Sequence, residues 1–291
     1  RSPDFTPGGS SAGSAAAVAD HMAPGAIGTQ TFGSVVRPAA FCGVVGFKPT
    51  FGTISRGALK PQAETLDTVG TFSRTVADVP LLMGALTGTD ARAFSGSAPD
   101  TPRVGVIRGP GWEKAQPETA AAIDRAAAAL SNAGARVEEI EVPALFEKAL
   151  DAHFTLGCFE IARSMAHERR VAPDKLSPEL LEMVVRGEGV AMSDYRAAVA
   201  VREAAAVRLA AVFGEHDVLL TASAPGEAPR MGDGTGNPVF NRFWTFLHVP
   251  CITLPCGTGP NDLPTAVQLI GPLGGDVSLI AIAREAEKAL A

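Results

Sequence analysis

The first residues that could do chemistry form a glycine- and serine-rich run near the start of the chain, Gly8-Gly9-Ser10-Ser11-Ala12-Gly13-Ser14. A phosphate-binding loop needs two glycines with four residues between them, followed by lysine and then serine or threonine. Gly8 and Gly13 have that separation, but Ser14 occupies the position of the lysine, so this run does not indicate a nucleotide site. A flexible linker has the same composition, and the run alone leaves that interpretation open.

Residues 28–50 form a second unusual segment, with the sequence GTQTFGSVVRPAAFCGVVGFKPT. Together the two segments closely resemble the amidase signature family, in which a Gly-Gly-Ser-Ser-Gly-Gly-Ser loop precedes a Gly-Ser stretch that ends in Cys-Gly-x-x-Gly-x-Lys-Pro-Thr. The match is nearly unbroken from Pro7 to Gly52, looser near 67–70 and 241–271, and a matter of pattern only over about 100–215. Because both halves of this motif occur in the family's order, a flexible linker does not explain the glycine–serine run.

The chemistry of amide cleavage fits a serine in the second segment. An amide carbonyl is a poor electrophile, so a serine must lose its proton as it attacks, and the developing oxyanion needs fixed donors. Ser34 follows Gly33 and is expected to begin a helix, where backbone N–H groups lack partners. The resemblance implies that Ser34 is the nucleophile. It also implies an oxyanion hole, contributing ~2.7–4 kcal/mol per donor, that is built from the amides of Thr31, Phe32, Gly33 and Ser34.

The resemblance further implies a serine–serine–lysine triad in place of a histidine base. Ser10, which lies 24 positions before Ser34, is then the bridging serine that transfers the proton, and the Gly9–Ser10 peptide bond is cis. Ser11 is expected to support the site through hydrogen bonds without taking part in catalysis. The five histidines lack a motif that would make one of them the base and are expected to be surface or core residues: His21, His153, His167, His216 and His248.

The lysine of the family's triad lies several dozen residues before the bridging serine, and this sequence has no residues there. Lys48 belongs to the Lys-Pro-Thr end of the motif, where the family's lysine is structural, and Lys60 falls in an expected loop. The remaining lysines have no matching context: Lys114, Lys148, Lys175 and Lys288. We therefore expect the chain to be the larger, C-terminal part of a longer enzyme, with nucleophile and oxyanion hole but no base, and inactive by itself.

The substrate is indicated by fewer residues. Most family members place an arginine two residues after the nucleophile, whereas this chain has Val36 there and Arg37 next. That shift resembles malonamidase-like members, in which the arginine binds a substrate carboxylate, and a guanidinium fork suits a carboxylate. A structural ion pair at Arg37 is the open alternative. Phe32 would narrow the space beside the nucleophile and favours a small substrate, while Phe243, Trp244 and the 223–238 loop either line the acyl pocket or belong to the core.

The leading hypothesis is an amidase that hydrolyses a small carboxamide to a carboxylate and ammonia or an amine through an acyl-Ser34 ester. Two alternatives stay open. One is a glutaminase subunit similar to that of the tRNA-dependent amidotransferase, against which the shifted arginine and the acidic balance count. The other is a non-catalytic remnant or scaffold.

The helices and strands that must position these residues are predicted to form an α/β fold. A strand at 104–107, a helix at 117–133 and a strand at 137–142 favour a parallel strand–helix–strand unit. We expect the amidase signature fold, with a mixed β-sheet core and helices on both faces. Residues 1–291 are interpreted as one amidase domain, incomplete at its N-terminus, and divide into a signature core (1–100), a mostly helical middle (101–215) and the C-terminal part of the core (216–291).

Composition limits the partners. The net charge is −6 with both signs interspersed, so no basic stripe indicates nucleic acid. Four cysteines are too few for a disulfide framework in 291 residues and lack a common zinc spacing, so we expect reduced thiols, no metal, no cofactor and a cytoplasmic protein. No apolar run approaches the ~20 residues of a membrane span. The expected partner is a small-molecule amide, and a homodimer remains open.

Overall fold

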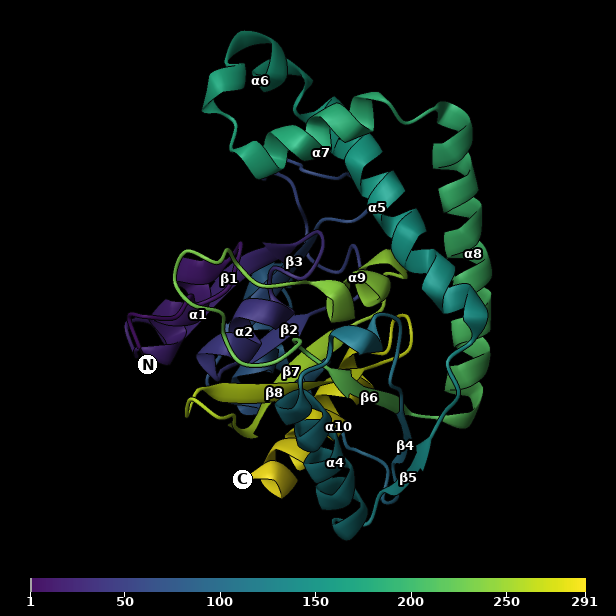
Figure 1. Ribbon diagram of the computed structural model, residues 1–291. Helices are drawn as coiled ribbons and strands as arrows, with labels where there is room; N and C mark the ends of the chain where they lie inside the picture. Colours follow the sequence, from purple (N-terminus) through teal and green to yellow (C-terminus); the bar gives the residue numbers. More distant parts are fainter. Residues whose placement is uncertain (1) are drawn as a thin grey trace.

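The computed structural model describes residues 2–291 and centres on one mixed eight-stranded sheet (Figure 1). The strand order is β1-β3-β2-β7-β8-β6-β4-β5, in which β4 pairs in parallel with β5 and β6 and every other pairing is antiparallel. The strands are β1 (Gly25–Gln30), β2 (Val45–Lys48), β3 (Thr68–Ser73), β4 (Arg103–Val106), β5 (Arg136–Glu139), β6 (Val218–Ala222), β7 (Cys251–Thr258) and β8 (Pro264–Ile270). The predicted α/β fold with a mixed sheet is confirmed.

Helices cover both faces of this sheet. Side chains alternate between the two faces along a strand, so Leu220, Ile252 and Leu269 join one apolar cluster, while their neighbours Leu219, Cys251 and Ile270 join another. The first cluster includes side chains from α3 (Val79–Thr87), α4 (Pro117–Asn132) and α10 (Asp276–Leu290). The second includes side chains from α2 (Val36–Cys42), α5 (Ala144–Ser164), α8 (Met192–Glu215) and α9 (Val239–Phe246).

The helical middle forms an arm that projects from the sheet (Figure 1). It consists of α5, α6 (Ala166–Val171), α7 (Pro178–Glu188) and α8, as the purely helical signals of that region predicted. The base of α5 carries Phe146, which lies against Phe243 of α9 with ring centroids 4.4 Å apart. The arm is thereby anchored in the second apolar cluster, next to α9.

Shorter elements complete the chain. Helix α1 (Ala12–Ala19) follows the glycine–serine run and packs with β1 and α2 in a small apolar cluster. Four 3-10 turns occur at η1 (Val76–Asp78), η2 (Ala91–Phe94), η3 (Trp112–Lys114) and η4 (Pro173–Lys175). Residues 223–238 contain no helix or strand, as predicted, apart from one isolated bridge between Arg230 and Phe5.

Several predicted boundaries were wrong by a few residues. The strand predicted over 104–107 spans Arg103–Val106. The strand predicted to reach residue 142 ends at Glu139. Strand β7 extends over Cys251–Thr258, since its pairing with β8 continues past a β-bulge. Pairing partners, which lie far away in the sequence, set these limits.

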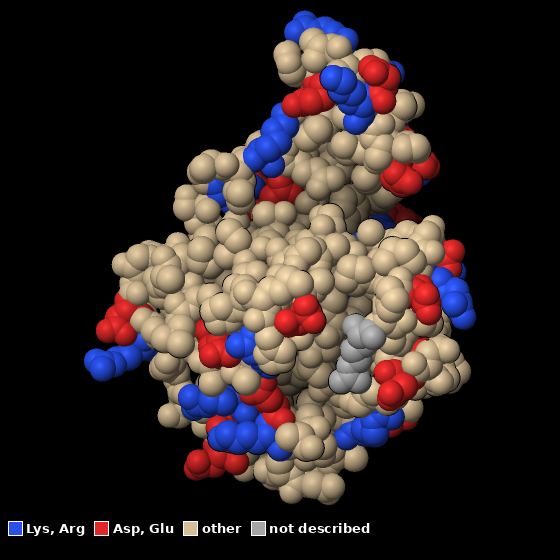
Figure 2. All heavy atoms as spheres, turned by 90° about the vertical axis from the view of Figure 1, so that its left-hand side faces the viewer, with Lys and Arg blue, Asp and Glu red and all other residues tan. Residues whose placement is uncertain are grey.

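The surface has charges of both signs. On the face shown in Figure 2, Lys and Arg side chains are intermixed with Asp and Glu, and much of the centre is uncharged. In residues 2–291, no helix has the length and apolarity that crossing a membrane requires.

Gly187 provides a test of the arm's packing. A Cβ atom at Gly187 of α7 would lie 1.9 Å from the carbonyl oxygen of Cys158 in α5. We expect Gly187→Ala to lower the free energy of unfolding by ~1–3 kcal/mol, because the added methyl group would overlap with α5. Urea denaturation followed by circular dichroism measures the change.

Gly214→Ala in α8 is the matched control, because a Cβ there meets nothing within 4 Å. An added methyl group at an open helical position stabilises by up to ~0.5–1 kcal/mol. Equal stability of the two variants would contradict the close approach of α7 to α5.

Candidate active site

The two predicted catalytic serines lie in loops that precede helices. Ser10 is exposed, just before α1, and the Gly9–Ser10 peptide bond is cis, as the resemblance implied. Ser34 is half-buried in the turn that joins β1 to α2. The helix predicted to begin at Ser34 begins two residues later, at Val36. The structure thus places Ser34 in a turn rather than inside a regular helix.

Contacts on both sides of Ser10 tie its loop to the two elements that flank Ser34. The Ser11 hydroxyl accepts from the Thr29 N–H (3.3 Å) and lies 3.4 Å from the Thr29 carbonyl, to which it donates, so it attaches the loop to β1. On the other side, Arg37 of α2 donates to the carbonyl of Gly9 over 2.7 Å. The role of Ser11 as a supporting residue of the site stays a prediction.

The turn before α2 presents a row of free backbone donors. Among the described residues, no acceptor receives a hydrogen bond from the amides of Thr31, Phe32, Gly33 or Ser34. These are the four groups predicted to form an oxyanion hole. Gly33 lies close to α9, because a Cβ there would be 2.9 Å from Pro238 and 3.0 Å from Asn241. A larger residue at 33 would therefore displace the turn from α9.

Gln30 holds the end of this turn, and the sequence analysis did not single it out. Its side chain is fully buried, and its Oε1 accepts from the amides of Val35 (2.9 Å) and Val36 (3.1 Å). Its Nε2 donates to the hydroxyl of Thr245 in α9 over 2.9 Å. Gln30 thus supplies partners for the first amides of α2 and leaves the preceding ones free. A buried amide side chain at the end of a strand, just before a helix start, was the available signal.

Arg37 joins three segments around Ser10. Its guanidinium donates to the carbonyls of Gly236 (2.5 Å) and Gly9 (2.7 Å) and to the hydroxyl of Thr235 (3.2 Å). Burial lowers the pKa of Arg37 to about 10, so it remains a cation at neutral pH. The alternative role as an ion pair is wrong for residues 2–291, since no carboxylate there contacts it, and its buried Nε has no partner among them.

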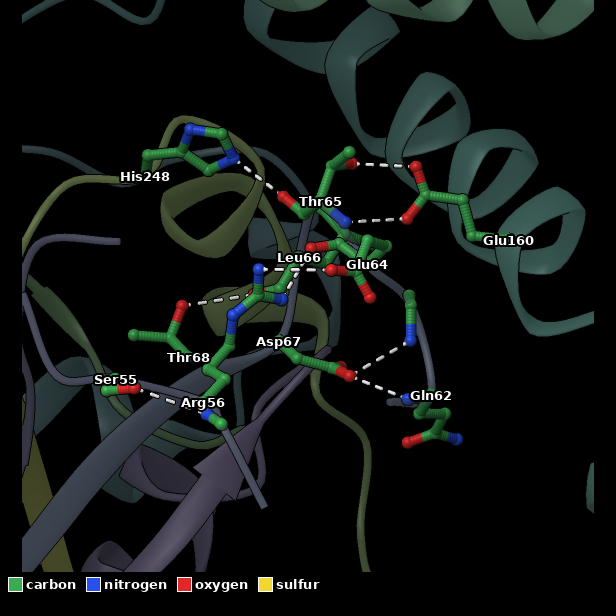
Figure 3. A network of polar contacts seen from close by, with 12 residues as sticks. Ser55, Arg56, Gln62, Glu64, Thr65, Leu66, Asp67, Thr68, Glu160 and His248 are labelled. Atoms are coloured by element: carbon green, nitrogen blue, oxygen red, sulfur yellow. Dashed lines mark hydrogen bonds and ion pairs between the residues drawn. The ribbon is translucent and has the colours of Figure 1, made fainter. Parts of the chain in front are cut away.

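Polar contacts within the loop between β2 and β3 and from it to α5 are drawn in Figure 3, and this loop also supports the turn through Thr31. Asp67 accepts from the Thr31 hydroxyl over 2.6 Å and from the amides of Gln62 (2.6 Å) and Ala63 (3.1 Å). Next to it, Thr65 donates through its amide and hydroxyl to Glu160 of α5, over 2.8 Å each. The arm therefore fixes the loop, and the loop fixes Thr31.

A cavity of about 530 Å³ lies between this loop and the end of β1. Its polar lining includes both cationic and acidic side chains from the loop, together with threonines of the β1 end: Thr29, Thr31, Arg56, Lys60, Glu64 and Asp67. Thr31 is thus both a wall of this cavity and the first residue of the turn that carries Ser34.

Two lysines, Lys48 and Lys60, make contacts with groups other than the candidate serines. Lys48 is fully buried and donates to the carbonyls of Val249 (2.6 Å) and Pro49 (3.0 Å), and burial lowers its pKa. Lys60 pairs with Glu168 of the arm over 2.9 Å. These contacts agree with the structural role predicted for Lys48.

The aromatic residues considered for an acyl pocket are largely core. Phe243 and Trp244 are each 2% exposed and belong to the second apolar cluster, as their core interpretation predicted. Phe32 is half-buried against the rings of His153 and Phe154 of α5, with centroid distances of 4.8 and 6.2 Å. Within residues 2–291, no group of three or more His, Cys, Asp or Glu is placed to hold a metal ion.

Known proteins resemble this chain in sequence over most of its length. The family model described as Amidase matches residues 1–280. The A subunit of the glutamyl-tRNA(Gln) amidotransferase of Picosynechococcus sp. is 32% identical over 98% of this chain and 68% of its own length, and that of Deinococcus radiodurans is 34% identical over 95% and 66%. The chain spans about two thirds of the length of these relatives.

Solved structures resemble the chain over its whole length. A crystal structure of an amidase superposes with a TM-score of 0.91 and 30% identity, covering 100% of this chain and 68% of that one. A 6-aminohexanoate cyclic dimer hydrolase complexed with substrate superposes with a TM-score of 0.87 and 27% identity, covering 99% and 69%.

Gln30→Met tests how the turn is held. The change keeps the size of the side chain but leaves two buried amides of α2 without an acceptor. We expect the free energy of unfolding to fall by about 2–4 kcal/mol, measured by urea denaturation. Gln116→Met, the same change at an exposed glutamine, should cost less than ~1 kcal/mol. Equal losses would contradict a special role for Gln30.

One buried histidine, His153, and one half-buried histidine, His248, predict a dependence of stability on pH. Burial lowers the pKa of His153 from 6.5 to about 3 and that of His248 from 6.5 to about 4. Below pH 6.5 the unfolded chain therefore binds protons that the folded chain does not, and the free energy of unfolding should fall as the pH falls towards 4. Two groups give at most ~2.7 kcal/mol per pH unit.

Urea denaturation between pH 7 and pH 5 measures this slope. His248→Asn should reduce it by about half, and asparagine tolerates the left-handed conformation of residue 248, where φ is 64°. An unchanged slope in this variant would exclude His248 as one of the two groups.

Proposed function

The chain belongs to the amidase family, and on that premise we propose that it hydrolyses a small carboxamide to a carboxylate and ammonia or an amine through an acyl-Ser34 ester. The observation that carries the proposal is the turn at Thr31–Ser34, whose four consecutive amides have no acceptor among the described residues. Such donors stabilise the charge that develops on an attacked carbonyl oxygen. Gln30 and Asp67 hold this turn in place before a substrate binds.

In the proposed mechanism, the Ser34 hydroxyl oxygen attacks the amide carbon, and its proton passes to Ser10. The carbonyl oxygen becomes an oxyanion that accepts from the amides of the turn. The tetrahedral intermediate collapses, the C–N bond breaks, and the leaving amine takes a proton back through Ser10. Water then attacks the acyl-Ser34 ester and gives a proton to Ser10, the bond between the acyl carbon and the Ser34 oxygen breaks, the proton returns to Ser34, and the carboxylate is released.

The base that receives the proton from Ser10 stays a prediction. The family resemblance implies a lysine upstream of Ser10. Lys48 does not fit this role, because its ammonium group already donates to two backbone carbonyls and lies fully buried. The hydrolytic activity of the complete protein is proposed on this basis.

The substrate is proposed to be small, since the bulky residue Phe32 lies within the turn, two residues before Ser34. We further propose that the substrate carries a carboxylate and that Arg37 binds it, although few N–H groups of Arg37 are left to do so. Three of the five N–H groups of Arg37 already donate to the protein, so a substrate carboxylate would have to accept from the buried Nε, which has no partner among residues 2–291, or from the remaining N–H of Nη1.

A glutaminase function is the second candidate, favoured by the amidotransferase subunits among the relatives. Assays with glutamine beside acetamide, propionamide and malonamate separate the two. Faster release of ammonia from glutamine, together with a stably bound protein partner, supports the glutaminase. A protein that neither turns over any amide nor reacts at Ser34 would be a remnant or scaffold.

Ser34→Ala in the complete protein tests the nucleophile. We expect at least a ~10³-fold loss in kcat for amide hydrolysis and loss of covalent labelling by a fluorophosphonate, measured by ammonia release and intact mass. Ser10→Ala should lower both rates while leaving the nucleophile present. Ser14→Ala, which removes only a hydroxyl that donates to the Ile27 carbonyl, is the control and should leave both rates within about threefold. Retained activity in Ser34→Ala would refute the proposal.

A further inference from the structure

A buried histidine of the arm contacts the backbone of the candidate oxyanion turn. His153 of α5 is 0% exposed, and its Nε2 lies 3.1 Å from the carbonyl oxygen of Thr31. On the other side of the ring, Nε of Arg242 donates to Nδ1 over 3.4 Å. The proposed function assigns His153 no role, and the sequence pattern placed it only as a surface or core residue.

The two partners fix the state of the ring. A carbonyl oxygen only accepts and a guanidinium only donates, so His153 must carry its proton on Nε2 and a lone pair on Nδ1. Burial and the nearby charge of Arg242 lower the pKa of His153 to about 3 and keep the ring neutral. Arg242, in α9, is itself fixed by donation to the Leu150 carbonyl of α5 over 2.5 Å. The ring therefore has one orientation.

That orientation sets the direction of one donor in the turn. The carbonyl of Thr31 and the amide of Phe32 belong to the same planar trans peptide unit, in which C=O and N–H point in opposite directions. Since the carbonyl points at α5, the Phe32 amide points away from α5, and it has no acceptor among the described residues. Donation to the carbonyl also polarises the peptide and strengthens its N–H as a donor.

The same peptide is held at two further points. The Thr31 hydroxyl donates to Asp67, and the Phe32 ring meets the His153 ring edge-on with an interplanar angle of 81°. Rotation of the peptide would break its hydrogen bond with His153, while these side-chain contacts hold the residues on either side of it. The arm therefore restrains the turn directly through His153 and indirectly through Glu160 and the β2–β3 loop.

We propose that His153 is a positioning residue, which holds the Thr31 carbonyl and thereby aims the Phe32 amide at the oxyanion of the reaction. This inference rests on the proposed function, because it needs Ser34 to be the nucleophile. The proposal gives the arm a part in catalysis. The arm lies more than 100 residues after the turn in the sequence and outside the signature motif.

The test compares His153→Leu, which removes the donor, with His153→Gln, whose side-chain amide can still donate to Thr31. We expect His153→Leu to lower kcat by about 10- to 100-fold with little change in KM, because the lost donor acts on the transition state. The rate of fluorophosphonate labelling at Ser34 should fall in parallel. His153→Gln should retain both rates within about tenfold.

His216→Leu is the matched control, since His216 is also buried (4% exposed) but contacts Glu138 and Val212. It should be less stable than the wild type and still keep kcat and the labelling rate. Unchanged kcat in a folded His153→Leu variant, or equal losses in the Gln and Leu variants, would overturn the positioning role alone. A wild-type protein whose Ser34 neither labels nor supports turnover would overturn the proposed function as well.

If His153→Leu does not fold, ¹⁵N spectra of the imidazoles in the wild type decide the matter. The expected spectrum has a protonated Nε2 and an unprotonated Nδ1 at residue 153 from pH 8 down to pH 5. A proton on Nδ1, or a charged ring in this range, would mean that the contact with Thr31 is not the one described and would overturn the inference.

Discussion

The structure depends on a turn whose backbone donors must stay free and yet stay in place. Four consecutive amides before α2 have no acceptor among the described residues, and free donors of this kind normally attract water or rearrange. The turn is held instead by its other atoms. Gln30 binds the amides that follow, Asp67 binds the Thr31 hydroxyl, and His153 binds the Thr31 carbonyl. Donors held in this way need no reorganisation when charge develops in front of them.

The strand order explains how such distant residues meet. Strands β2 and β3, from the start of the chain, lie beside β7 and β8 from its end, so α9 packs against the turn that follows β1. The second face of the sheet is covered by the arm as well as by α9. Three regions of sequence therefore converge on one turn, and each contributes a buried side chain to it.

Buried cations near the site have backbone partners. Arg37 and Lys48 donate to carbonyl oxygens, with no carboxylate in contact among residues 2–291. Burial of a charge without a counter-charge is costly unless it is well hydrogen-bonded, and in both residues the pKa is lowered by that burial. The arrangement leaves the positive charge of Arg37 uncompensated beside the Ser10 loop, which favours negative charge developing nearby.

The sequence by itself determined the cis Gly9–Ser10 bond, the mixed α/β sheet and the helical arm, because these follow from a contiguous motif and from local periodicity. The site residues remain assignments by resemblance. Only the tertiary structure revealed the partners of Gln30, Arg37 and His153, which lie 215, 199 and 122 positions away. Hydrogen bonds over such separations depend on strand order and helix packing, which no local pattern encodes. The turn could thus be found in the sequence, but what holds it could not.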